Sequence, residues 1–258
     1  MRILLLTLVL SLGLAACAED DLVVPDSGVE PHTVTLTGRF MVSPGYDHPM
    51  SGASVCWQDS TGELCTNANE FGLATLQGIP AGAEGALLVR GAGAMRTLLP
   101  MVLGDVDTFV FHRLDNYFLI PDLYAQAGVP AAPDRGVIAV QVLQRSMLSG
   151  QLQSVHGATL TLSPVATGDE MLLHTHSGRR SWEGPFYVNA KGTEIVTGAN
   201  ATTWGGFAYF LAVDPAAGPY TVIATQGGVV CDGAEYGVAL PQVEVRARTE
   251  THARAVCD

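Results

Sequence analysis

Residues 52–82 read GASVCWQDSTGELCTNANEFGLATLQGIPAG, and the expected fold class follows from this stretch. Short runs that mix apolar and polar residues alternate with breaks containing Gly, Asn, Asp or Pro. Runs of this kind are typical of strands, and the breaks are typical of turns. The stretch therefore predicts a β-hairpin over 52–66, a third strand over 71–79 and a turn at 80–82.

The same pattern continues on both sides of this stretch. Short strands at regular spacing, separated by turn residues, favour a β-sandwich. The sequence predicts further strands at 34–42, 86–90, 96–103, 107–112, 137–143, 158–162, 171–174, 186–189, 207–213, 220–225, 243–249 and 251–257.

One segment interrupts the strand pattern. Between residues 116 and 128 apolar residues recur at helical spacing, and Gly128 and Pro130 would end a helix there. We therefore expect an all-β protein with two tandem β-sandwiches, at 33–115 and 136–258, joined by a short helix and linker at 116–135.

Three motifs of the opening stretch carry a family resemblance. Gly52–Val55, Thr66–Gly72 and Pro80–Gly82 are similar in order to the hallmark run of the carboxypeptidase regulatory-like domain, a transthyretin-like (Ig-like) β-sandwich. Phe71 departs from the family pattern, because it precedes Gly72 where the family places Gly before the aromatic residue. The second half repeats the order more loosely. The resemblance implies an ancillary β-sandwich without catalytic residues of its own.

The first residues have the pattern of an export signal. A positive start at Met1-Arg2 precedes an apolar run at 3–14, which is too short to span a bilayer. Leu14-Ala15-Ala16-Cys17 resembles the lipobox of bacterial lipoproteins. The resemblance implies that residues 1–16 are removed and that Cys17 is acylated, for example with palmitate. The alternative is an ordinary cleavable signal with a cysteine nearby by chance.

The residues after Cys17 suggest where the anchor lies. Lipoproteins kept at the inner membrane often have Asp in the next position, so Ala18 resembles the outer-membrane case. Residues 17–32 are acidic and contain two prolines, which is typical of a solvated tether. We expect a protein that is held at the bacterial outer membrane by lipid, on its periplasmic or surface face.

The remaining cysteines are even in number. Without Cys17, the chain has Cys56, Cys65, Cys231 and Cys257, which allow three disulfide connectivities. Proximity along the chain favours Cys56–Cys65 and Cys231–Cys257. A two-residue loop in the first hairpin would place Cys56 opposite Cys65, whereas a three-residue loop would shift that register by one. Free thiols and a zinc site remain alternatives, although these cysteines lack the close ligand spacing of zinc sites.

The composition excludes one class of partner. Thirteen basic residues against 25 acidic ones give a net charge of −12. Nucleic-acid affinity comes mainly from Lys and Arg, which displace counterions from the phosphates. We therefore expect no nucleic-acid partner.

His174 and His176 are the strongest candidates for a chemical site. Their spacing places two imidazoles on one face of a strand, but a catalytic zinc needs three protein ligands. Nucleophile-elbow, P-loop and zinc-protease motifs are absent from the sequence. We expect no metal, no cofactor and no catalytic residue, and hence no enzyme.

The favoured function is a lipid-anchored envelope protein with a non-catalytic binding or structural role. Trp57, Trp182 and Trp204 are candidate platforms for a polysaccharide, with core packing as the alternative. An envelope protein is the other candidate partner. Two further hypotheses remain open: a metal-binding protein or metal-dependent hydrolase that uses the His174/His176 region, and a subunit of an envelope assembly.

Overall fold

The structure, a computed structural model, describes residues 32–43, 48–115, 121, 124–125, 130, 132–155, 158–164, 171–175, 195–197, 207–231 and 242–257. Every element with assigned bounds in this part of the chain is a β-strand, so the all-β prediction is confirmed there. Pro121, Tyr124 and Ala125 are helical, but most of the expected linker helix lies outside the described residues. So do the expected signal peptide and the tether with Cys17. Within the described residues no helix has the length and apolar character that crossing a membrane requires.

The first hairpin forms with the register that a two-residue loop requires. It joins β3 (Ser54–Asp59) to β4 (Gly62–Asn67). The Asp59 carboxylate closes the turn, because its Oδ1 atom accepts hydrogen bonds from the backbone N–H groups of Thr61 at 2.7 Å and Gly62 at 3.2 Å. Asp59 therefore pairs with Gly62, and Cys56 falls opposite Cys65.

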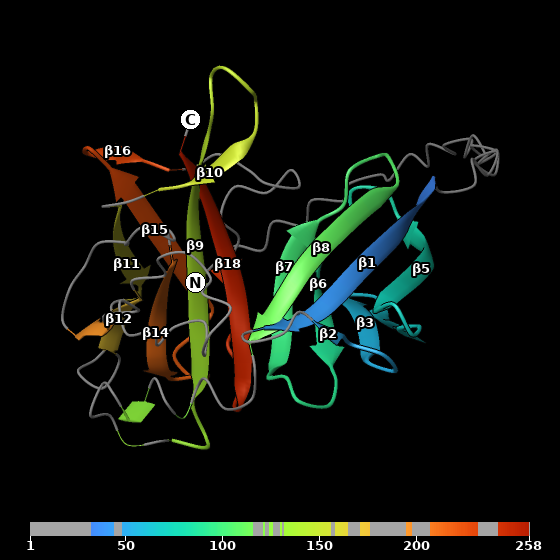
Figure 1. The fold of residues 1–258 in the computed structure, drawn as a ribbon, viewed down its shortest axis with the longest axis horizontal. Coiled ribbons are helices and arrows are strands. Elements are labelled where there is room, and N and C mark those ends of the chain that lie inside the picture. The colour runs from blue at the N-terminus through green and yellow to red at the C-terminus, as the bar shows by residue number, and fades with distance from the viewer. Residues whose placement is uncertain are drawn as a thin grey trace, which may run out of the picture. The chain divides into compact units, whose positions relative to one another are not determined.

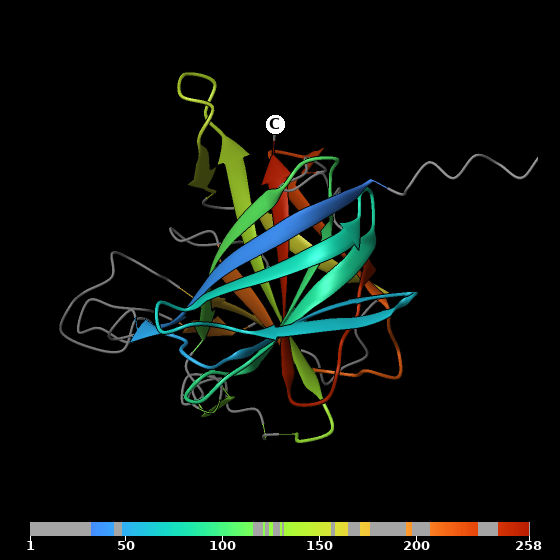
Figure 2. The same cartoon turned by 90° about the vertical axis from the view of Figure 1, so that its right-hand side faces the viewer.

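The first sheet is built around β1 (Thr33–Ser43). This strand pairs antiparallel with β2 (His48–Pro49) and β5 (Leu73–Pro80), and parallel with β8 (Thr108–Asp115). Figure 2 shows β1 in blue between the green β8 and the cyan β5.

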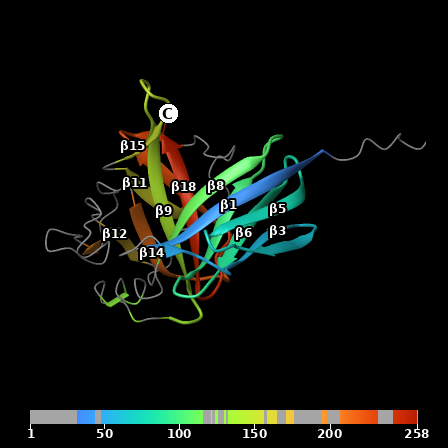
Figure 3. The same ribbon diagram turned by 45° about the vertical axis from the view of Figure 1, so that its right-hand side comes forward.

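The second sheet has ten strands and combines elements from both halves of the chain. The C-terminal strand β18 (Thr249–Cys257) lies between β7 and β9 and is parallel to both. Figures 1 and 3 show β18 in red beside β9. The strand order is β13 (Ile195–Thr197), β12 (Met171–Thr175), β14 (Phe207–Val213), β9 (Gly136–Arg145), β18, β7 (Arg96–Val102), β6 (Glu84–Arg90), β3 and β4, with β10 (Leu152–Ser154) also pairing with β9.

The third sheet contains β11 (Thr159–Ser163), β15 (Tyr220–Gln226), β16 (Val229–Val230) and β17 (Gln242–Val243). The last of these corrects a prediction. The expected strand at 243–249 is wrong, because β17 ends at Val243 and a turn at Ala247-Arg248 precedes β18. In this turn Arg248 has a φ of 55°, and the N–H of Thr249 donates to the carbonyl of Arg246 at 3.2 Å.

Two groups of buried side chains form between the sheets. The N-terminal core cluster joins residues of the first sheet, such as Phe40 and Leu76, to residues of the second sheet, such as Trp57 and Leu87. The C-terminal core cluster joins residues of the second sheet, including Val140 and Phe210, to residues of the third, including Leu160 and Val222. Each cluster therefore fills the space between two β-layers, and the second sheet contributes to both.

Pairing within the second sheet connects the two core clusters. Glu250 of β18 lies opposite Thr97 of β7 and opposite Val137 of β9. The chain from His32 to Asp258 forms one compact unit. The division into two sandwich domains at 33–115 and 136–258 stays a prediction.

Candidate functional site

Strand β18 carries polar side chains on the face that points away from the C-terminal core cluster. Ala253 and Ala255 belong to that cluster. Because side chains alternate between the faces of a strand, Glu250, His252 and Arg254 lie on the other face. The side chain of Glu250 is nevertheless 0% exposed, and that of His252 is 9% exposed. Ionisable side chains are almost never this deeply buried without a partner.

Residues from β8 and β14 meet these side chains. The end of β8 lies near β18 (Figure 1), and the imidazole rings of His112 and His252 meet edge to face with centroids 4.5 Å apart. Tyr209 Oη of β14 donates a hydrogen bond of 2.8 Å to Asp115 Oδ2. One ligand atom each from Asp115, Glu250 and His252 lie within 4.8 Å of one another. We call His112, Asp115, Tyr209, Glu250 and His252 the buried polar cluster.

Burial shifts the ionisation of this cluster towards neutral forms. Burial, and then the charge of Glu250, raises the pKa of Asp115 well above its ordinary value. Burial also raises the pKa of Glu250 to about 7 and lowers the pKa of His252 to about 4. The pKa of His112 lies well below its ordinary value for the same reason. Burial therefore favours neutral imidazoles, and it disfavours the charged form of the Asp115 carboxyl group.

The hydrogen bonds of the cluster are incomplete. His252 Nε2 and Glu250 Oε1 are 3.1 Å apart. Their geometry does not make an aligned hydrogen bond, and within the described part of the chain neither Glu250 oxygen has one. The neighbouring Asp115 carboxyl group nevertheless lowers the pKa of Glu250, which opposes the larger effect of burial. His112 Nε2 is also buried without a hydrogen-bond partner among the described residues. A buried polar atom without a hydrogen bond destabilises the folded state by about 1–3 kcal/mol. Either a bound ligand satisfies these atoms, or other interactions in the fold offset this loss of stability.

The burial of the cluster favours a structural role. His112 and Asp115 are 5% and 4% exposed, and Tyr209 and Glu250 are 0% exposed. A catalytic site must admit its substrate, whereas these side chains face one another between β8 and β18. The arrangement can hold the end of β8 against the second sheet.

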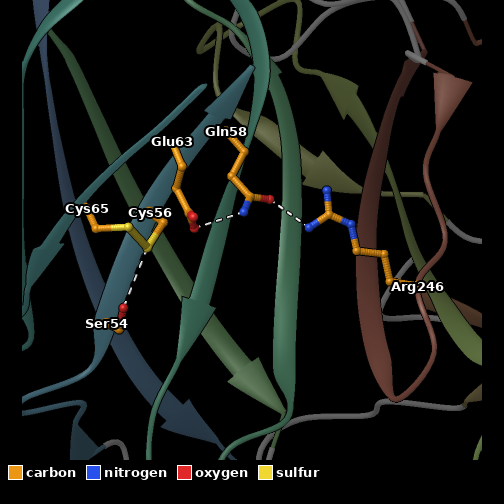
Figure 4. The surroundings of a disulfide bond; sticks show 6 residues. All are labelled: Ser54, Cys56, Gln58, Glu63, Cys65 and Arg246. Atoms are coloured by element: carbon orange, nitrogen blue, oxygen red, sulfur yellow. Dashed lines mark hydrogen bonds between the residues drawn. A yellow bond between two sulfur atoms is a disulfide. The ribbon is translucent and has the colours of Figure 1, made fainter. Parts of the chain in front are cut away.

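A second, open site lies along β3, β6 and β7. This groove of about 570 Å³ is lined by Glu84, Pro100 and Glu244, among other residues. Figure 4 shows the chain of hydrogen bonds at its wall: Arg246 Nη1 donates to Gln58 Oε1 at 2.6 Å, and Gln58 Nε2 donates to Glu63 Oε1 at 2.9 Å. These bonds hold the segment before β18 against β3 and leave a groove that is open to solvent.

The structure contains the two disulfides that proximity favours. Cys56 is bonded to Cys65 across the β3–β4 hairpin (Figure 4), and Cys231 is bonded to Cys257 at the end of β18. Of the three tryptophans, Trp57 is 2% exposed and lies in the N-terminal core cluster, so it is not a sugar platform. Trp182 and Trp204 lie outside the described residues.

The structure says little about the candidate site at His174 and His176. The backbone of His174 lies in β12 and pairs with Val196 and Ala208. Its side chain and the whole of His176 lie outside the described residues. The buried polar cluster, by contrast, was not predicted. Its only local signal is the alternation of Glu250 and His252 in the last strand, and the other members come from distant parts of the chain.

Comparison with known proteins gives no family. No family model matches the chain, and no curated protein does either. Among solved structures, the Bacillus anthracis TIE protein aligns with a TM-score of 0.29 and 13% identity over 88% of this chain. The alignment spans 34% of that protein, which is about a third of its length.

Two shorter structures align at the same level. The shaft pilin SpaA from Lactobacillus rhamnosus GG gives a TM-score of 0.27 and 9% identity over 88% of this chain and 98% of its own. A DUF3823 family protein from Parabacteroides merdae gives a TM-score of 0.26 and 11% identity. The alignment covers 78% of this chain and 94% of that protein. Scores this low carry no inference about fold or function.

Proposed function

We propose that this chain is a lipid-anchored protein of the cell envelope with a non-catalytic binding or structural role. The observation that carries the proposal is the pairing of the cysteines. Four of the five cysteines are bonded to one another, which leaves Cys17 as the one available for acylation. Disulfides persist in oxidising compartments outside the cytoplasm, so the two bonds also support export.

The anchor proposed on Cys17 fits the physical needs of membrane attachment. A single acyl chain holds a protein only weakly, and stable anchoring needs a second signal. The lipobox resemblance at residues 14–17 implies several acyl chains on one cysteine. Residues 17–32 would then separate the folded part from the outer membrane as an acidic tether.

The proposed architecture has two sandwich modules that share one sheet. The two core clusters, each between two β-layers, support this division. We also propose that the first module is a divergent relative of the carboxypeptidase regulatory-like domain, on the motifs at 52–55, 66–72 and 80–82. The linker at 116–135 would contain the short helix, in keeping with the helical Pro121, Tyr124 and Ala125.

Replacement of the anchor residue tests the proposed function. Cys17→Ser should move the exported protein from the membrane fraction to the soluble fraction, because no thiol remains to be acylated. The matched control is Ala18→Ser, which keeps the thiol and should stay with the membrane. Fractionation and immunoblotting measure the distribution. A Cys17→Ser variant that remains tightly bound to membranes would show that the anchor is elsewhere.

A specific surface favours the assembly subunit as a second candidate. Among the strands that the structure describes, β8 pairs only with β1. Its outer face exposes Phe109, at 56%, and Phe111, at 38%, and the Arg113 guanidinium lies over the Phe111 ring. Exposed edge strands with aromatic side chains are common protein-binding surfaces. A partner in the envelope would cover this face.

A further inference from the structure

We propose that the buried polar cluster is a structural zinc site in which Asp115, Glu250 and His252 are ligands and His112 completes a four-coordinate centre. The inference does not depend on the lipid anchor. It adds a metal where the sequence alone predicts none, and it explains why two carboxyl groups and two imidazoles share one buried space.

The distances fit a single small cation. Zinc binds imidazole nitrogen and carboxylate oxygen at about 2.0–2.2 Å, which separates tetrahedral ligand atoms by roughly 3.3–3.6 Å. His252 Nε2 and Glu250 Oε1 are 3.1 Å apart, and the three-residue set including Asp115 spans no more than 4.8 Å between ligand atoms. Small side-chain movements would therefore bring all three to a common ion.

The orphaned atoms are those that a metal would use. Both Glu250 oxygens, His252 Nε2 and His112 Nε2 are buried without aligned hydrogen bonds in the described part of the chain. Each offers a lone pair to a cation when the imidazole is neutral. His112 lies outside the set of three residues whose ligand atoms are within 4.8 Å of one another, but its ring contacts that of His252, with centroids 4.5 Å apart. A rotation of the His112 side chain would therefore be needed for it to supply the fourth ligand.

The neighbours of the cluster would orient one of these ligands. Tyr209 donates to Asp115 Oδ2 and so fixes the orientation of the Asp115 carboxyl group beside Glu250 and His252. Hydrogen bonds of this kind fix the orientation of ligating groups in known metal sites. Two buried carboxylates would also be balanced by the two positive charges of the ion, although Arg254 lies further along the same face of β18.

The ligand set selects the metal and its role. Calcium and magnesium prefer oxygen ligands, whereas two imidazoles with two carboxylates suit zinc. The burial of all four side chains leaves no open position for substrate, which is the mark of a structural centre rather than a catalytic one. Such a centre would tie β8, at the edge of the first sheet, to β18 in the middle of the second.

The test begins with the metal content of the wild-type protein. The full chain, with its own leader and a tag that contains no histidine, is purified from whole cells without chelators. Elemental analysis should find one zinc per chain. Removal of zinc with a chelator should lower the thermal midpoint, and addition of zinc alone should restore it, since a ligand that binds only the folded state stabilises it.

Variants locate the ion. Glu250→Gln and Asp115→Asn keep the side-chain shape but remove the anionic ligand, and each should lose the bound zinc. Tyr209→Phe should keep zinc with about 10–100-fold weaker affinity, as expected for loss of an orienting hydrogen bond. The matched control is Glu244→Gln, an exposed carboxylate near β18, which should bind zinc like the wild type.

The outcomes distinguish a buried zinc site from a carboxyl pair without metal and from a zinc ion on the surface. A folded wild type that contains no zinc and takes up none after chelation and zinc addition would overturn it, and the cluster would then be a hydrogen-bonded carboxyl pair. Zinc that survives in Glu250→Gln but is lost in Glu244→Gln would also overturn it, because the ion would sit on the surface. If the cluster variants fail to fold, the wild-type measurement decides alone.

Discussion

Asp59 shows how a single side chain sets a register. Its carboxylate accepts hydrogen bonds from Thr61 and from Trp57 Nε1, and these bonds lower its pKa from 3.8 to about 2. A carboxyl group whose pKa is lower in the folded protein stabilises the fold above its unfolded pKa. That contribution is lost as the pH falls from about 4 through about 2.

Asp59→Asn should remove this part of the acid sensitivity. The thermal midpoint of the wild type should fall more between pH 5 and pH 2 than that of the variant, because only the wild type protonates this group. Circular dichroism melts at constant ionic strength measure both. Equal losses in the two proteins would mean that the turn does not depend on the charge of Asp59.

Gly72 is required by the turn before β5. Its φ is +73°, and a Cβ atom there would lie 2.3 Å from the carbonyl oxygen of Phe40. Gly72→Ala should therefore destabilise by roughly 2 kcal/mol or more, the left-handed penalty of about 1–2 kcal/mol plus the clash. Gly78→Ala is the matched control, because Gly78 has a φ of +79° with open space around its Cβ position. Denaturant unfolding should show the larger loss for Gly72→Ala, and similar losses would contradict the clash.

At the scale of residues, the sequence could predict the features that involve close neighbours along the chain. The two-residue loop at Ser60–Thr61 and the resulting Cys56–Cys65 pair involve neighbours along the chain, so turn rules were sufficient. The Cys231–Cys257 bond was favoured by proximity in the sequence, and β15, β16 and β18 bring its ends together.

At the scale of strands, the outer face of β8 is the surface most suited to a partner. Phe109→Ser/Phe111→Ser should reduce co-purification of envelope proteins with the anchored protein at least about tenfold, because buried aromatic side chains at interfaces often contribute more than 1 kcal/mol each. Phe71→Ser is the matched control, since Phe71 is 57% exposed but lies in a turn. Quantitative mass spectrometry of the co-purified proteins measures the loss. An unchanged set of proteins would remove the β8 face from the proposal.

Strand boundaries were harder to predict than strands. The alternating residues at 243–249 read as one strand, yet the chain turns at Ala247-Arg248 without a glycine or proline. The turn becomes necessary only because β17 belongs to the third sheet and β18 to the second. The sheet that a strand joins depends on tertiary contacts, so the local alternation of apolar and polar residues does not predict it.

At the scale of the whole molecule, pairing between strands that are distant in the sequence creates the features that could not be predicted. The parallel pairing of β18 with β7 and β9 places the last strand of the chain in the middle of the ten-stranded sheet. The buried polar cluster depends on this pairing, since His112 and His252 are 140 residues apart in the sequence. An all-β fold was predictable from local alternation, but this cluster was not.

Mass spectrometry of the N-terminal peptide from membrane-extracted protein tests the lipid anchor most directly. We predict a mature chain that starts at Cys17, with several acyl groups on that residue. A chain that still begins at Met1, or an unmodified Cys17 in the membrane-bound protein, would contradict it.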